Sequence, residues 1–130
     1  MATDTSRISA LHFEHQLWTN ELRFFEDEIN IYEGYLSDLV THSNDKEMLA
    51  KLEHFQNQFI RQKEVIDHMR HDIREHEHAI SHFAEANPSY STSDEVRFED
   101  HDDLRDRMDQ FKRIYSDLKK EFYQFMRKWM

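Results

Sequence analysis

Mostly apolar residues recur along the chain at alternating steps of three and four, the spacing of one face of a packed helix. The first row consists of Ile8, Leu11, His15, Trp18, Leu22, Phe25, Ile29, Tyr32, Leu36 and Leu39. The second row consists of Met48, Leu52, Phe55, Phe59, Gln62, Ile66, Met69, Ile73, His76, Ile80 and Phe83. The third row consists of His101, Leu104, Met108, Phe111, Tyr115, Leu118, Phe122, Phe125 and Trp129. Each row predicts one long helix with this face in the core.

Two polar stretches separate the rows and set the expected helix limits. The stretch THSND ends the first helix, and Ser43 or Asn44 can cap the second. The stretch NPSYSTSD ends the second helix, because Pro88 disfavours helical geometry at the residue before it. We therefore expect helices over about 7–42, 45–86 and 93–129. Short connections between long helices predict a single all-α domain over 1–130, an antiparallel up-down-up three-helix bundle with coiled-coil-like heptad packing.

Composition supports this fold and narrows the classes of function. The chain has one glycine and one proline among 130 residues, too few for the turns of a multi-stranded β fold. It has no cysteine, which excludes disulfides, thiolate zinc sites and cysteine nucleophiles. The acidic net charge of −10 argues against nucleic-acid binding, since phosphate contacts need a basic surface. Without a membrane-length apolar run or the pattern of a secretory signal, we expect a cytoplasmic protein and no membrane insertion.

The chain is rich in histidine, and five of its ten histidines lie in the stretch EVIDHMRHDIREHEHAISH. Four of the five share the outward face of the expected second helix, where they alternate with glutamates. This outer ladder comprises Glu64, His68, His71, Glu75, His78, His82 and Glu85. Side chains four residues apart project side by side, so His78 and His82 can chelate one Zn²⁺, Ni²⁺ or Cu²⁺ beside Glu75. The alternative is that an outward face is polar and that histidine and glutamate simply fill it.

A second group of histidines occupies core positions. His15, His76 and His101 each stand in a core row, one on each expected helix, and His12 flanks the first. Folding the helices together places all four within about one and a half turns, so they are candidate ligands for Zn, Cu, Ni or Fe. Carboxylates close enough in sequence for mixed coordination are Glu14, Asp72, Asp100 and Asp102. The ordinary explanation, which we favour from sequence, is a hydrogen-bonded core histidine, with Asp72 as the expected partner of His76.

The expected first helix carries a further apolar row beside its core face. Leu17, Phe24 and Ile31 follow one another at seven-residue intervals and would be largely exposed in an isolated three-helix bundle. Between this row and the core face run Glu14, Glu21, Glu28 and Tyr35. An exposed apolar row marks a partner surface, and the default arrangement is a symmetric homodimer. A wide core-facing apolar arc is the alternative explanation.

No motif of a known catalytic class accompanies these features. The chain lacks an HExxH zinc motif, and Gly34 as the only glycine leaves no phosphate-binding loop. Ferritin-like di-iron proteins use four helices with inward Glu-x-x-His pairs, whereas Glu75 and His78 form such a pair on an outward face. We therefore expect a non-catalytic interaction or scaffold protein that acts through self-association or a partner on the first helix. The alternative is a transition-metal-binding or metal-buffering bundle that uses its histidine-rich half.

Overall fold

The computed structural model describes residues 2–86 and 93–130, with side chains at 8–81 and 100–130. These residues form three long α-helices. Their bounds are α1 (Ala2–His42), α2 (Lys46–Ala86) and α3 (Ser93–Trp129). The α1 helix begins earlier than expected, whereas the other limits agree with the expectation to within one residue. The predicted break at Pro88 and the side chains of His82, Phe83 and Glu85 lie outside the described residues.

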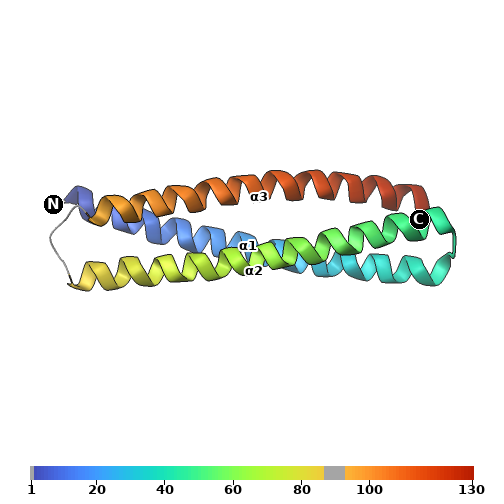
Figure 1. The fold of residues 1–130 in the computed structure, drawn as a ribbon, viewed down its shortest axis with the longest axis horizontal. Helices are drawn as coiled ribbons and strands as arrows, with labels where there is room; N and C mark the ends of the chain where they lie inside the picture. Colours follow the sequence, from blue (N-terminus) through green and yellow to red (C-terminus); the bar gives the residue numbers. More distant parts are fainter. Residues whose placement is uncertain (1, 87–92) are drawn as a thin grey trace.

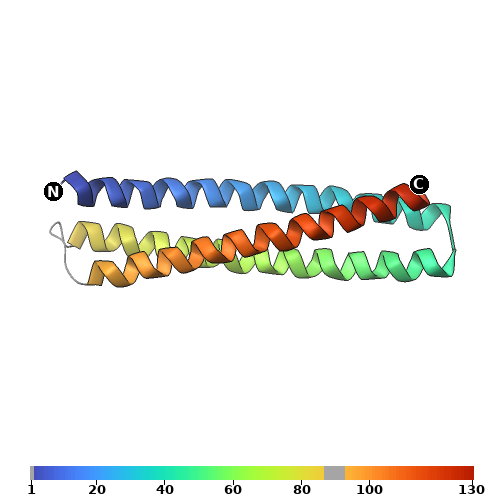
Figure 2. The same ribbon diagram turned by 90° about the horizontal axis from the view of Figure 1, so that it is seen from above.

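The three helices run up, down and up alongside one another, so that α1 begins at one end of the bundle and α3 finishes at the other (Figure 1). The view turned by 90° shows the same order (Figure 2). At 1.5 Å per residue each helix is about 55–60 Å long. The predicted all-α, antiparallel three-helix bundle is confirmed. Within the part of the chain that the structure describes, none of the helices carries an apolar stretch able to cross a bilayer.

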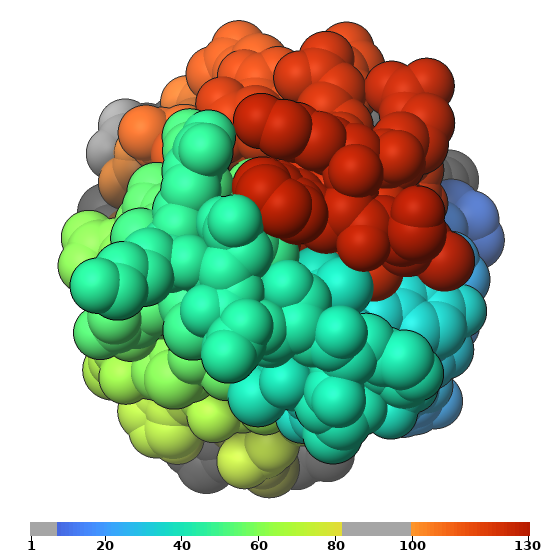
Figure 3. All heavy atoms as spheres, turned by 90° about the vertical axis from the view of Figure 1, so that its right-hand side faces the viewer, coloured from blue at the N-terminus to red at the C-terminus, as the bar shows by residue number. Residues whose placement is uncertain are grey.

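The turn between α1 and α2 has a defined cap. The Oδ1 atom of Asp45 accepts a hydrogen bond from the backbone N–H of Met48 at 3.0 Å. The hydroxyl oxygen of Ser43 accepts a bond from the backbone N–H of Asp45 at 3.2 Å. The cap expected at Ser43 or Asn44 is therefore wrong, because Asp45 directly precedes the first helical residue and satisfies a free N–H there. Figure 3 shows this end of the molecule, where the turn and the last residues of α3 cover the core.

The core follows the three predicted rows. Every described member of the rows is buried, apart from Ile8, Phe25 and Trp129, which are partly buried. The polar members are buried as well, namely His15, Gln62, His76 and His101. The heptad register read from the sequence is therefore the register of the folded bundle.

A row of ion pairs joins α1 to α3 along the edge of the core. The distances are 2.5 Å for Glu14–Arg105, 2.6 Å for Glu21–Lys112 and 3.0 Å for Glu28–Lys119. Successive pairs lie seven residues apart on both helices, so each pair occupies equivalent positions beside the core. We call these three pairs the ion-pair row.

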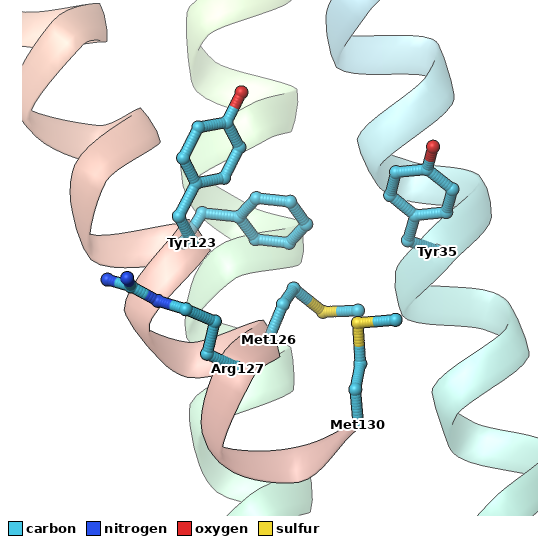
Figure 4. Close-up of a pocket in the computed structure, with 6 residues that line it drawn as sticks. Tyr35, Tyr123, Met126, Arg127 and Met130 are labelled. Atoms are coloured by element: carbon cyan, nitrogen blue, oxygen red, sulfur yellow. The ribbon is translucent and has the colours of Figure 1, made fainter.

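One heptad beyond the ion-pair row, Tyr35 and Met126 occupy the corresponding positions. Met126 is buried although it lies outside the predicted rows. The two residues border an apolar hollow of about 420 Å³ between the ends of α1 and α3. Figure 4 shows Tyr35 on the α1 side, with Met126 and Met130 extending toward it from α3. A tyrosine and a methionine thus stand where the ion-pair row would have its next pair, which explains why Met126 is buried.

Candidate metal centre

One histidine from each helix meets at a single level of the core. His15 of α1, His76 of α2 and His101 of α3 are all buried. Their ring centroids lie 5.0 to 5.6 Å apart. One ring nitrogen from each histidine lies within 4.8 Å of the other two, and no other set of three donors among the described residues is so placed. We call these residues the histidine trio.

The heptad register explains why the trio forms. His15 and His101 occupy equivalent core positions on the parallel helices α1 and α3, and His76 occupies a core position on the antiparallel α2. Three imidazoles therefore replace aliphatic side chains in one layer of a mostly apolar core. The indole of Trp18, one turn along α1, stacks on the ring of His101 with centroids 4.8 Å apart and an angle of 26°. This aromatic contact covers one side of the layer.

The carboxylate of Glu77 orients the ring of His15. The Nδ1–H group of His15 donates to Oε2 of Glu77. A neutral imidazole carries one proton, so Nε2 of His15 presents its lone pair inward. Nδ1 of His76 lies 3.0 Å from this Nε2 atom. The ring of His15 therefore has its Nδ1 atom held by the carboxylate of Glu77 and its Nε2 atom directed at the imidazole of His76.

The carboxylate of Glu14 orients the ring of His101 in the same way. The Nε2–H group of His101 donates to Oε1 of Glu14 at 2.8 Å. Arg105 donates to both oxygens of Glu14, at 2.5 and 3.2 Å. The remaining nitrogen of His101, Nδ1, is buried and has no hydrogen-bond partner. A buried polar atom in this condition is unusual in a folded protein.

The electrostatics favour the neutral form of His15 and His101 and the ionised form of the two carboxylates. Burial lowers the pKa of His15 and of His101, and it outweighs the opposing attraction of Glu77 and Glu14. The hydrogen bond from Arg105 lowers the pKa of Glu14 against the effect of burial. Burial by itself would raise the pKa of Glu77, but its contacts with His15 and His12 together lower it. Neutral imidazoles held by ionised carboxylates are the state in which histidine binds a metal.

His12 lies beside the trio and does not belong to it. Its Nδ1–H group donates to Oε1 of Glu77, so Glu77 bridges His12 and His15. The His12 side chain is 36% exposed, whereas that of His15 is 3% exposed. Of the four internal histidines expected to gather, three are in contact and the fourth is joined to them through a carboxylate.

The expected pairing of Asp72 with His76 is wrong. Asp72 forms an ion pair of 2.8 Å with Arg107 of α3 and lies 3.5 Å from its neighbour His71. Because Arg107 is permanently charged, it is the stronger partner for an exposed carboxylate. His76 instead contacts His15, and the carboxylates that hold the trio are Glu77 of α2, on His15, and Glu14 of α1, on His101.

The outer ladder forms no compact site among its described members. His68, His71, Glu75 and His78 are all exposed. The closest ladder contact is 3.8 Å, between Nε2 of His71 and Oε1 of Glu75 one turn away. The side chain of His82 lies outside the described residues. The described ladder therefore behaves as a solvated polar face with isolated pairs.

Glu77 is the site residue that sequence reasoning missed. It directly follows His76, at the position beside the core where flanking charges reach across to a neighbouring helix. Lys63 and Arg70 occupy the same heptad position on α2 and reach Glu33 and Glu26 of α1 at 2.8 and 2.9 Å. Attention to this flanking position, rather than to proximity along the chain, would have identified Glu77.

The structure leaves the apolar row of α1 uncovered. Leu17, Phe24 and Ile31 are 45%, 59% and 54% exposed. They do not belong to a wide core-facing arc, because the flanking glutamates turn inward to α3 while these side chains remain in solvent. We call them the α1 face.

Comparisons with protein-family models, with curated proteins and with solved structures give no match for this chain.

Proposed function

We propose that the protein binds one divalent transition-metal ion through His15, His76 and His101. The observation that carries this proposal is the convergence of three buried imidazoles, one from each helix, with donor nitrogens within 4.8 Å of one another. Imidazole ligands suit Zn²⁺, Cu²⁺, Ni²⁺ and Fe²⁺. Four-coordinate zinc bound by nitrogen at about 2.0–2.1 Å holds its ligands about 3.3 Å apart, so small ring rotations close the trio on an ion.

The surroundings of the trio support metal binding over a purely structural role. Metal-bound histidines almost always donate their second N–H to a carboxylate or carbonyl, which fixes the tautomer. Glu77 and Glu14 provide this contact to His15 and His101. An ion would also satisfy the buried lone pair of His101 Nδ1, which hydrogen bonding leaves unsatisfied. The corresponding biological role is metal binding or buffering.

Metal analysis of the protein purified without a histidine tag tests this proposal, followed by calorimetric titration with Zn²⁺, Cu²⁺, Ni²⁺ and Fe²⁺. We expect one tightly bound ion per chain and a rise in unfolding temperature, because an ion that binds only the folded state adds RT ln(1 + [L]/Kd) to stability. The variant with His76→Ala and His101→Ala should lose both effects.

The exposed pair His71→Ala and His78→Ala provides the matched control and should retain tight binding. His101→Leu, which preserves side-chain bulk, serves if the double alanine variant does not fold. Tight binding that survives His101→Leu but disappears with the control pair would contradict the proposal and assign the ion to the outer ladder.

A second function, self-association, is favoured by the exposure of the α1 face. Two copies pairing antiparallel about Phe24 would place Leu17 of one on Ile31 of the other, since both lie seven residues from Phe24. Exposed apolar rows of this kind are typical of helix partners. Light scattering at micromolar concentration should give twice the chain mass of 16.0 kDa.

Phe24→Asp should return the protein to monomer, because it places a charge at the centre of the interface. Asp27→Ala, at an exposed position on the same helix, should leave the dimer intact. A wild-type protein that is monomeric at every concentration would rule out the homodimer and leave a different protein as the partner of the α1 face.

A further inference from the structure

Two surface hollows of opposite charge reach the histidine trio on either side of α2. The hollow between α1 and α2 has a volume of about 630 Å³ and is lined by His15 and Glu77. Arginines also line it, namely Arg23, Arg70 and Arg74. The hollow between α2 and α3 has a volume of about 360 Å³ and is lined by His76. Its acidic side chains, Asp72, Glu75, Asp100 and Asp103, outnumber Arg107.

Three imidazoles leave a divalent ion with an open coordination position. Zinc sites with three protein ligands hold a water molecule or a substrate in the fourth position. Glu14 and Glu77 are engaged by Arg105, His101, His12 and His15 in the layer outside the ligands. Because both carboxylates already have these partners, neither is free to act as a fourth ligand. The open position is available to an outside molecule.

The charges beside a bound ion balance one another. The ion brings two positive charges, and the carboxylates of Glu14 and Glu77 oppose them with two negative charges. Arg105, bound to Glu14, is itself paired with Asp102 at 2.7 Å. The preference for an anion at the open position therefore comes from the positive charge of the neighbouring α1–α2 hollow.

The arginines of the α1–α2 hollow select the kind of anion. Arg70 is fixed by its ion pair with Glu26 at 2.9 Å. Arg23 and Arg74 are exposed and line the same hollow from α1 and α2. The planar guanidinium group matches carboxylate and phosphate with two parallel hydrogen bonds. His15 and Glu77 line the same hollow, so these arginines lie on the side of the trio from which an anion would approach the ion.

We infer that the metal-loaded protein binds a small oxyanion, a carboxylate or a phosphate, in the α1–α2 hollow. One oxygen occupies the open position on the ion, and a second accepts hydrogen bonds from Arg23 or Arg74. This inference rests on the proposed metal function. The acidic hollow beside His76 repels the same anion, so the oxyanion site lies on the α1–α2 side alone.

The protein loaded with Co²⁺ provides the test, because the visible absorption of Co²⁺ changes when a coordinated water is replaced. Acetate and phosphate are titrated in separate arms, with chloride at matched ionic strength as the reference anion. We expect both oxyanions to shift the spectrum at concentrations where chloride does not. The variant with Arg23→Ala and Arg74→Ala should bind them about tenfold more weakly or worse, since charge-assisted hydrogen bonds are lost.

A matched variant, Arg61→Ala with Arg113→Ala, removes the same charge from exposed positions outside the hollow. It should change oxyanion affinity by less than about twofold. Both double variants should bind Co²⁺ as the wild type does. Failure of the trio to bind Co²⁺ overturns both proposals. Bound Co²⁺ with a spectrum that oxyanions do not alter, or oxyanion binding that survives loss of Arg23 and Arg74, overturns the oxyanion site alone.

Discussion

Three imidazoles in one core layer cost stability that aliphatic side chains would not. His101 is 1% exposed, and its Nδ1 atom has lost its water without gaining a partner. Such an atom costs on the order of 1–3 kcal/mol. Replacement of buried polar groups by apolar side chains of similar volume is often neutral or stabilising. A contribution to stability therefore does not explain a histidine at this position, whereas the proposed metal site would.

The unpartnered Nδ1 atom of His101 predicts that His101→Leu does not destabilise the metal-free protein. The unfolding free energy should stay equal to that of the wild type or rise by about 1–2 kcal/mol, because Glu14 keeps its bonds to Arg105 while the unpartnered nitrogen disappears. Urea denaturation in the presence of a chelator measures the effect.

Core truncations in the same bundle provide the reference for this measurement. Leu22→Ala and Phe59→Ala, at fully buried positions, should each cost about 2–5 kcal/mol, whereas exposed Asp27→Ala should change little. A loss of stability for His101→Leu as large as that of the truncations would show that the histidine serves packing instead.

The sequence predicted which residues face the core but not every contact they make. Periodicity placed His15, His76 and His101 in the core, since burial follows from position in the heptad, and folding the helices about their short connections brought the three to a similar level. The partners of the trio depend on how flanking side chains cross between helices. Proximity along α2 suggested Asp72 for His76, but Arg107 of another helix attracts Asp72 more strongly. Glu77 was missed for the same reason, because its partners are 62 and 65 residues away.

At the scale of helices, the apolar rows predicted the fold because each row remains in phase for most of its helix. The ends were harder to predict, since a cap depends on single side chains such as Asp45. Met126 shows the same limit, because its burial results from the presence of Tyr35 in place of a fourth glutamate on α1. The burial of a residue beside the core thus depends on two helices, whereas each apolar row describes a single helix.

The ion-pair row predicts that α1 and α3 recognise each other by charge. Glu21→Lys places two cations beside each other at Lys112 and should destabilise the protein, whereas adding Lys112→Glu should restore most of the loss. The coupling should be about 0.5–1 kcal/mol, because both side chains are about a third exposed and water screens the pair. A double-mutant cycle measured by urea denaturation gives this value, and additive effects of the two substitutions would exclude the pairing.

At the scale of the whole molecule, charge and stability are both coupled to histidine protonation. Full protonation of the ten histidines would cancel the formal charge of −10, which reduces the repulsion that keeps molecules apart. Protonation of the buried His15 and His101 also changes the free energy of unfolding.

The trio predicts that the metal-free protein loses stability as the pH falls from 7.5 to 5.5. The folded state lowers the pKa of His15 and His101, with burial as the main cause and repulsion from other imidazoles adding to it. The charged and titratable groups around them are Glu77, Glu14, Arg105, His12 and His76. Below the unfolded histidine pKa of about 6.5, the unfolded chain binds protons that the folded chain does not, so acid favours unfolding.

Urea denaturation across this pH range should show the decline, with a slope approaching about 1.4 kcal/mol per pH unit for each proton taken up on unfolding. Glu14 and Glu77, whose pKa values are lowered, extend the loss to more acidic pH in the same direction. The His71→Ala and His78→Ala variant should retain the full slope, since both side chains are exposed, whereas His101→Leu should reduce it. A wild-type profile that is flat between pH 7.5 and 5.5 would mean that folding leaves the histidine pKa values unchanged. A stability that rises toward acid would mean that the carboxylates hold the trio protonated, and a protonated trio would have to release protons before it could bind an ion.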